Sequence, residues 1–259
     1  MSTPHPLDLT GQVALVTGGN SGVGLGMAEG LARAGADVCV WGRSPEKNKA
    51  AAEQLAAHGR RVAVYEVDIR DEEAVVAGFI RTVGEFGRLD SCFANAALAN
   101  AMTSPPFLDS TLQQWRDLMR IDLEGAYLTT REAARHMVEL GNGGSIVLTS
   151  SIAALFGAPR EQAYAAAKGA LLSLSRSLAV EFGRYGIRAN AVLPGWTRSP
   201  VFDGWLENPA VSEKVMSRIP LRRWGTPEDW AGVAIYLASP ASSFHTGDCL
   251  RLDGGYGVF

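Results

Sequence analysis

The chain of 259 residues is long enough for one large α/β domain or two small ones, and its hydrophobic fraction of 47% is ordinary for a globular protein and argues against disorder. Its net charge is -3 with basic residues spread along the chain, so we expect no nucleic-acid partner. No apolar run approaches the ~20 residues of a membrane helix, so we expect no membrane partner either.

The first predicted strand covers 12–17 and runs into a glycine-rich turn, GGNSGVGLG. A helix follows as far as about Ala34, with Gly35 as its stop signal. Glycines let a backbone approach a pyrophosphate, and a helix N-terminus supplies N–H donors and positive potential. The turn therefore predicts a dinucleotide-binding element made by Gly18, Asn20, Ser21, Gly22, Val23 and Gly24.

The second predicted strand covers 37–41, and Ser44 followed by Pro45 is typical of the helix start that comes next. In dinucleotide-binding folds, an acidic residue at this strand end holds the ribose hydroxyls of NAD, whereas an arginine nearby accommodates the 2′-phosphate of NADP. Here Arg43 stands at that place and no carboxylate does. Arg43 could be a solvated charge before the helix, but we favour NADP(H) as the cofactor, with NAD(H) as the alternative.

Polar residues follow the third and fourth predicted strands, which cover 61–67 and 89–94. Asp68 could touch the adenine, or it could cap the helix that begins at about Asp71, and both interpretations stay open. The cofactor site that we predict includes Asp68 and Ile69. It also includes Asn95, because a polar side chain at a strand's carboxyl end suits a structural or cofactor contact.

A long helix is predicted over 111–140, ended by the glycines that follow it. Asp122 is unusual because it falls in an apolar portion of this helix, Ile-Asp-Leu. It could face solvent or cap a kink. It could also be a polar group that points at the catalytic centre.

A strand at 146–149 ends at Ser151, and open α/β sheets bind ligands at the carboxyl ends of their strands. A loop and then a proline-free, alanine-rich helix follow, over about 160–182. Tyr164 and Lys168 are four residues apart on this helix, so their side chains share one face.

These three residue types make chemical sense together. A free tyrosine titrates near pH ~10, and an ammonium group close by lowers that pKa by favouring the phenolate. Tyr164 could then exchange a proton with an alcohol or alkoxide near neutral pH, while the Ser151 hydroxyl holds the same substrate oxygen. The alternative is a surface tyrosine beside a solvated Lys168, because Tyr-x-x-x-Lys also occurs by chance.

A sixth strand is predicted over 187–193, stopped by Pro194 and Gly195. The segment 196–219 changes character, with two prolines, Pro220 directly after it and several aromatic residues, and predicts a flap over a pocket. A helix at 226–237 and a strand at 249–252 complete an alternation of strands and helices. This alternation predicts a single α/β domain over 1–259, a doubly wound, Rossmann-type parallel sheet.

The three cysteines, Cys39, Cys92 and Cys249, each lie in an apolar, strand-like run, which indicates buried free thiols in a reducing compartment. The N-terminus lacks the basic and apolar regions of a secretory signal. We therefore expect a cytoplasmic protein. The four histidines are scattered without metal-ligand spacing, so the sequence predicts no metal site.

With these residues assembled, the chain resembles the short-chain dehydrogenase/reductase family, in its compact single-domain form, over almost its whole length. Five ordered motifs carry the resemblance: the Thr-Gly-x-x-x-Gly-x-Gly turn from Thr17, Asn95-Ala96 as part of Asn-Asn-Ala-Gly, the set Ser151, Tyr164 and Lys168, then Pro194-Gly195, and finally Asp253-Gly254-Gly255. The Asn-Asn-Ala-Gly motif lacks its first Asn and its final Gly here.

The resemblance implies hydride transfer at the nicotinamide C4, with Tyr164 as acid/base and Ser151 orienting the substrate oxygen. Lys168 would hold the nicotinamide ribose hydroxyls and tune Tyr164. Many family members carry an Asn that supports a proton-relay water where this chain has Asp122, which we include among the catalytic residues. Pro194, Gly195 and Thr197 would border the cofactor. The resemblance also implies a homotetramer, or at least a dimer.

The leading hypothesis is an NADP(H)-dependent oxidoreductase of a small-molecule ketone and secondary alcohol pair. We place Ser151, Gln162, Tyr164 and Trp196 at the substrate. Apolar residues suggest a pocket less polar than a free-sugar site, whereas Arg160, Gln162 and Arg198 could bind a polar or acidic group. The runner-up is an NAD-dependent alcohol or polyol dehydrogenase, and outside the class a non-catalytic dinucleotide-binding regulator.

Overall fold

The computed structural model describes residues 5–98, 104–199, 206 and 208–258. Seven parallel strands form one sheet in the order β3-β2-β1-β4-β5-β6-β7. Their bounds are β1 Val13–Thr17, β2 Asp37–Gly42, β3 Val62–Glu66, β4 Ser91–Ala94, β5 Gly144–Thr149, β6 Ile187–Pro194 and β7 Cys249–Leu252. The strand order reverses between β1 and β4, and ligands of such sheets bind at that switch point.

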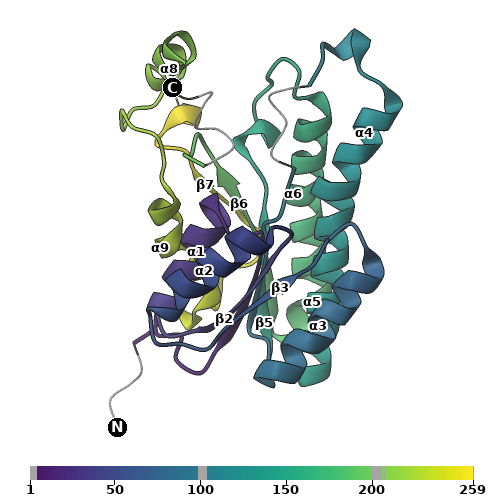
Figure 1. Ribbon diagram of the computed structural model, residues 1–259, viewed down its shortest axis with the longest axis vertical. Helices are drawn as coiled ribbons and strands as arrows, with labels where there is room; N and C mark the ends of the chain where they lie inside the picture. The colour runs from purple at the N-terminus through teal and green to yellow at the C-terminus, as the bar shows by residue number, and fades with distance from the viewer. Residues whose placement is uncertain (1–4, 99–103, 200–205, 207, 259) are drawn as a thin grey trace.

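Helices cover both faces of the sheet (Figure 1). One face packs against α1 Gly22–Arg33, α2 Pro45–Ala56 and α9 Ala231–Ala238. The other packs against α3 Glu72–Phe86, α5 Gly125–Leu140 and α6 Gln162–Phe182. Two further helices, α4 Leu112–Met119 and α8 Pro209–Met216, lie beyond the carboxyl ends of the strands (Figure 1). The prediction of a doubly wound parallel sheet is confirmed.

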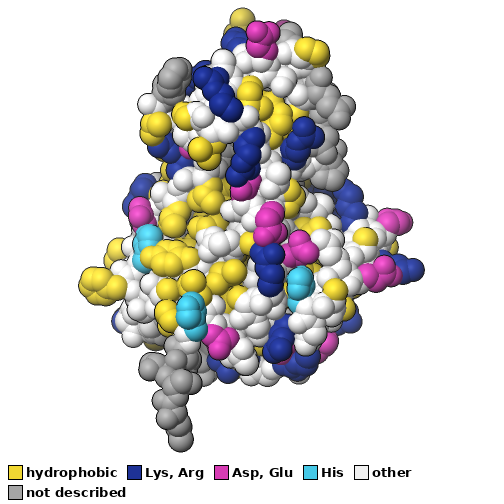
Figure 2. All heavy atoms as spheres, turned by 90° about the vertical axis from the view of Figure 1, so that its left-hand side faces the viewer, with side chains coloured by type: hydrophobic (Ala, Val, Ile, Leu, Met, Phe, Trp, Pro, Cys, Tyr) yellow, Lys and Arg dark blue, Asp and Glu magenta, His cyan; other side chains and the backbone are white. Residues whose placement is uncertain are grey.

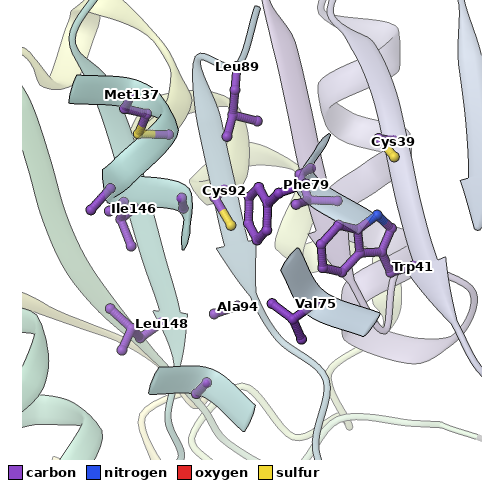
Figure 3. Close-up of a cluster of buried hydrophobic side chains, with 14 of the residues drawn as sticks. Cys39, Trp41, Val75, Phe79, Leu89, Cys92, Ala94, Met137, Ile146 and Leu148 are labelled. Carbon is purple, nitrogen blue, oxygen red and sulfur yellow. The ribbon is translucent and has the colours of Figure 1, made fainter. Parts of the chain in front are cut away.

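Each face of the sheet has its own hydrophobic core, because successive strand residues point to opposite faces. In β1, Leu15 belongs to the core beneath α3 and α5, whereas Val16 belongs to the core beneath α1 and α9. Figure 3 shows the first of these cores, where the ring centres of Trp41 and Phe79 lie 4.9 Å apart in an edge-to-face arrangement. Both strand faces are therefore apolar, as in other buried parallel sheets.

Local sequence signals place several helix starts correctly. Ser44 caps α2 by accepting a hydrogen bond from the Lys47 N–H, with Pro45 as the first helical residue. Asp71 caps α3 by accepting from two backbone N–H groups of the first turn. Asp71 is thus the cap, and Asp68 is free for another role.

The long helix expected over 111–140 is interrupted. Residues Arg120–Glu124 form a π-helical turn between α4 and α5, and Asp122 lies in its middle. Single π turns inside α-helices are rare and concentrate at functional sites. A π turn requires no particular residue type, so the sequence pattern did not reveal it.

A glycine contact between α1 and the turn before α9 offers a stability test. A Cβ on Gly26 would lie 1.8 Å from the Pro227 carbonyl oxygen, so the Gly26→Ala variant is expected to lose about 2–3 kcal/mol of unfolding free energy. The control is Gly232→Ala in α9, where a Cβ meets nothing within 4 Å. It should gain roughly 0.5–1 kcal/mol. Urea unfolding measures both, and equal effects would contradict the contact argument.

Candidate active site

The glycine-rich turn between β1 and α1 folds as a cradle in which added side chains would collide. Gly18 and Gly22 have φ values of 64° and 54°, in the left-handed region that favours glycine. A Cβ on Gly24 would lie 2.3 Å from the Gly18 carbonyl oxygen. The cradle therefore fits a closely approaching pyrophosphate, with the N-terminus of α1 beside it.

Asn95 ties the end of β4 to this turn. Its Nδ2 donates to the Thr17 carbonyl over 3.0 Å, and its backbone N–H donates to the Thr17 hydroxyl over 3.0 Å. A cavity runs along the turn, and we call it the dinucleotide cavity. Its lining includes the predicted cofactor residues Gly18, Asn20, Ser21, Gly22, Val23, Gly24, Arg43, Asp68, Ile69, Asn95 and Tyr164.

The β2 end of the dinucleotide cavity is positively charged. Arg43 and Lys47 both line it, with the Ser44 hydroxyl near them. Asp68 also lines the cavity but forms an ion pair with Arg70, whose guanidinium holds the pKa of that carboxyl below its usual range, with a smaller effect of Arg43. This end of the cavity therefore suits a phosphate group.

Ser151, Tyr164 and Lys168 come together where β5 ends. Ser151 accepts a hydrogen bond at Oγ from the Ala153 N–H over 3.1 Å, which fixes the start of a short 3-10 turn. Lys168 is only 2% exposed, and its Nζ donates to the Thr149 carbonyl over 3.2 Å. The same Nζ lies 5.5 Å from the centre of the Tyr164 ring. The interpretation of Lys168 as a solvated charge is therefore wrong.

Asp122 is fully buried and faces the same lysine. Its Oδ1 accepts from the Leu98 N–H over 2.6 Å, and its Oδ2 lies 3.4 Å from Lys168 Nζ. Among the described residues, that Oδ2 has no hydrogen-bond partner, so the ion pair is its main contact. Of the open interpretations of Asp122, a solvent-facing carboxylate is wrong, because the π turn directs it inward.

Burial raises the pKa of Tyr164 above that of a free phenol, and the Lys168 ammonium opposes this increase. The carboxylates of Asp122 and Glu161 raise the pKa further, whereas the Ser151 hydroxyl lowers it. In the chain by itself the pKa of Tyr164 is raised, not lowered as the sequence predicts. The physical reason is that burial and two carboxylates outweigh one ammonium group.

A second cavity opens on the other side of Tyr164, and we call it the substrate cavity. It is lined by the predicted site residues Ser151, Tyr164, Lys168, Pro194, Gly195, Trp196 and Thr197. Its remaining lining is largely apolar and includes Ile152, Phe156 and Leu206. Because Val23, Asn95 and Tyr164 line both cavities, the two cavities meet at Tyr164.

The structure does not bring every predicted substrate residue to this cavity. Gln162 is exposed and lines neither cavity, because residues two positions apart on a helix, as Gln162 and Tyr164 are, do not face each other. Arg160 and Arg198 are also exposed and outside the lining. Part of the predicted flap at 196–219, namely 200–205 and 207, falls outside the described residues.

Several lining residues were missed from the sequence. Glu161 lies directly before α6, where its charge gave no motif, and Tyr256 reaches the substrate cavity from the C-terminal tail. Lys47 reaches the dinucleotide cavity from the first turn of α2. A second basic residue four positions after Arg43 was the one signal that could have identified Lys47.

Across 5–98, 104–199, 206 and 208–258, no group of three or more His, Cys, Asp or Glu side chains could hold a metal ion. No helix in these ranges is both long and apolar enough to cross a membrane. Cys39 and Cys92 are free and buried, and burial raises the pKa of the Cys39 thiol to about 12. Cys249 is free but only partly buried, so the expectation of full burial is wrong for it.

Comparison with known proteins agrees with this architecture. A family model described as enoyl-(acyl carrier protein) reductase matches residues 18–257. A 2,5-dichloro-2,5-cyclohexadiene-1,4-diol dehydrogenase from Sphingobium indicum is 38% identical over 96% of this chain and 98% of its own length.

Two solved structures superpose over nearly the whole chain. A short-chain type dehydrogenase/reductase from Mycobacterium marinum has a TM-score of 0.91 and 32% identity, covering 97% of each chain. A gluconate 5-dehydrogenase from Burkholderia cenocepacia, in complex with NADP and tartrate, has a TM-score of 0.91 and 31% identity, covering 98% of each chain. These matches, together with the sheet order and the glycine cradle, show that the chain belongs to the short-chain dehydrogenase/reductase family of NAD(P)-dependent oxidoreductases.

Proposed function

We propose that this protein transfers a hydride between NADP(H) and a ketone or secondary alcohol, with Tyr164 as the acid/base. The observation that carries the proposal is the meeting of the two cavities at Tyr164, beside a buried lysine. When bound, the nicotinamide ring gives or accepts the hydride at its C4. The chain itself must then position the substrate carbon and move one proton.

Each catalytic residue has a distinct task in this proposal. The Ser151 hydroxyl hydrogen-bonds the substrate oxygen, because Ser151 and Tyr164 line the same cavity. In reduction, the Tyr164 hydroxyl donates its proton to that oxygen, and in oxidation the phenolate removes it. Lys168 would hold the nicotinamide ribose hydroxyls of a bound cofactor, and its ammonium stabilises the phenolate. Asp122 holds Lys168 in place through the 3.4 Å ion pair.

The preference for NADP(H) rests on Arg43 and Lys47 at one end of the dinucleotide cavity. The Arg43→Ala variant is expected to weaken NADPH binding about tenfold to a hundredfold, since a charge-assisted contact to phosphate is lost. NADH binding should change by less than about twofold, because NADH lacks the 2′-phosphate. Fluorescence titration with each nucleotide measures both. An equal loss for NADH would remove Arg43 as the reader of the phosphate.

The substrate class is narrowed by the cavity, which is largely apolar near Tyr164. A gluconate 5-dehydrogenase and a chlorinated cyclohexadiene diol dehydrogenase are both relatives, so ring alcohols and sugar acids are both candidates by relationship. We infer a secondary alcohol or ketone with an apolar ring or chain. The second candidate is an NAD-dependent alcohol or polyol dehydrogenase. Arg43 is exposed, and if its side chain does not contact a 2′-phosphate, the same cavity would suit NAD.

The test is a panel of ketones and secondary alcohols assayed with NADPH, NADH and their oxidised forms, followed by nicotinamide absorbance. We expect turnover of at least one pair, with a higher kcat/KM for the phosphorylated nucleotide. A higher kcat/KM with NAD would favour the second candidate. A chain that binds nucleotide but turns over no ketone or alcohol would contradict the proposal.

We also propose that the protein forms a homotetramer and that it is cytoplasmic. Apolar side chains gather on the face that lies on the left in Figure 1, as Figure 2 shows. Val180, Leu221 and Phe244 are among the large apolar side chains left exposed in the single chain. Exposed apolar surface of this kind marks interaction sites. Light scattering of the purified protein measures the assembly state.

A further inference from the structure

Glu161 stands at the wall of the substrate cavity, three residues before Tyr164. It occupies the N-cap position of α6, so its side chain and that of Tyr164 are one helical turn apart, with Cβ atoms roughly 5–6 Å apart. Glu161, Ser151 and Tyr164 line the same cavity, so a substrate bound at Tyr164 and Ser151 shares that cavity with Glu161. We therefore expect a neighbouring part of that substrate to contact the Glu161 side chain.

The fold makes no use of this carboxylate. A glutamate at a helix start commonly accepts hydrogen bonds from the free N–H groups there, but the Glu161 side chain makes no capping bond. It also forms no ion pair and no hydrogen bond with any of the residues that the structure describes. Burial raises the pKa of the Glu161 carboxyl. A half-buried acceptor without a partner points to a ligand.

Among the described residues, the lining of the substrate cavity holds no free cation to balance Glu161. The only other charged side chain of its described lining is Lys168, which is already paired with Asp122. The part of the lining that the structure describes therefore presents one unpaired negative charge to an occupant.

Two guanidinium groups lie behind the cavity wall and are engaged elsewhere. Arg218 stacks on the Tyr256 ring at 4.3 Å and donates to its hydroxyl over 3.0 Å. Arg251 forms an ion pair with Asp253 at 3.2 Å. Neither lines the substrate cavity, so neither offers a carboxylate-binding site there.

We propose that Glu161 sets the charge class of the substrate. Its carboxylate accepts a hydrogen bond from a second hydroxyl of a neutral alcohol or hydroxyketone and excludes substrates that carry a carboxylate. The inference rests on the proposed function and narrows it to neutral diols and hydroxyketones. It assigns Glu161 a role in specificity, in addition to the increase in the pKa of Tyr164 that its charge causes.

The experiment compares three alcohols with one ring: cyclohexane-1,2-diol, cyclohexanol and 3-hydroxycyclohexanecarboxylate. For the unmodified protein, we expect kcat/KM for the diol to exceed that for the hydroxy acid at least tenfold at low salt. Between about 0.01 M and about 1 M salt the Debye length falls from ~30 to ~3 Å. Activity toward the hydroxy acid should therefore rise with salt, while activity toward the diol changes by less than about twofold.

The Glu161→Gln variant removes the charge and keeps the shape. It should raise kcat/KM for the hydroxy acid about tenfold, mainly through KM, and abolish the salt dependence. The Glu161→Ala variant should lower the preference for the diol over cyclohexanol about fivefold, since the hydroxyl loses its acceptor. The matched control is Glu181→Gln, which removes the same charge from an exposed position at the other end of α6 and should change neither ratio.

The outcomes separate this inference from the proposed function. Turnover of the ring alcohols with an acid-to-diol ratio that Glu161→Gln leaves unchanged would overturn the role of Glu161 alone. A panel without any turnover, in all forms of the protein, would overturn both. If a variant fails to fold, the salt dependence of the unmodified protein decides, and a flat response for the hydroxy acid overturns the inference.

Discussion

The Tyr164→Phe variant is expected to lose roughly 10³-fold in kcat/KM for both directions of the reaction while its dinucleotide affinity stays within about twofold. The hydroxyl is the one atom that the substitution removes, and the ring keeps its place between the two cavities. Without the hydroxyl, the substrate oxygen loses the proton donor that the proposal assigns to it. Ser151 cannot replace it, because a serine hydroxyl is a far weaker acid than a tyrosine.

The measurement combines a nicotinamide absorbance assay with a fluorescence titration of the reduced nucleotide. The control is Tyr185→Phe, which removes the hydroxyl of an exposed tyrosine just beyond α6 and should leave both quantities unchanged. If Tyr164→Phe keeps its full rate, Tyr164 is not the acid/base and the proposed mechanism fails. If both rate and affinity collapse, the hydroxyl also serves nucleotide binding or the fold, and the lost rate does not identify Tyr164 as the acid/base.

The fold and the centre of the site follow from short-range patterns. The glycine-rich turn sits between a strand and a helix, and Tyr164 and Lys168 share one face of a single helix. The physics that relates such residues acts over a few positions, so the sequence alone predicts their neighbourhood. The strand order then brings Ser151 to the same place, because β5 and α6 are consecutive elements.

The remaining features depend on contacts between distant segments. The direction of Asp122 depends on a π turn, and the burial of Lys168 depends on the packing of α6 against β5 and β6. The raised pKa of Tyr164 depends on such contacts too, because it results from burial and from two carboxylates that come from different elements. Tyr256 lies 92 positions after Tyr164 in the sequence, yet both line the substrate cavity. No local pattern identifies such a residue.

The Lys168→Met variant is expected to lose activity and also about 3–5 kcal/mol of stability, which lowers Tm by roughly 10 °C. Methionine fills nearly the same volume but leaves Asp122 as a buried carboxylate with no cation beside it. An unpaired buried charge is costly, whereas an intact pair costs little net free energy relative to apolar residues of similar volume. The expected loss of stability therefore comes from Asp122, not from the missing lysine contacts.

The double variant Asp122→Asn/Lys168→Met separates these two effects. An amide at position 122 still accepts from the Leu98 N–H and carries no charge, so the double variant should recover most of the lost stability. It should remain inactive, because Tyr164 still lacks its ammonium neighbour. Thermal unfolding of the two single variants and the double variant gives the coupling free energy between Asp122 and Lys168. Additive losses would mean that the 3.4 Å contact is not an energetic pair.

The Asp122→Asn variant alone is expected to shift the pH–rate profile of the reaction. Three charged groups act on Tyr164: Lys168 favours the phenolate, and the carboxylates of Asp122 and Glu161 oppose it. Removing one carboxylate lowers the pKa of Tyr164, so the phenolate forms at lower pH. The rising limb of the pH–rate profile for alcohol oxidation should therefore move to lower pH, while Glu181→Gln leaves it in place. A profile that stays unchanged would make Asp122 structural, and the buried ion pair would then serve the fold and not the proton transfer.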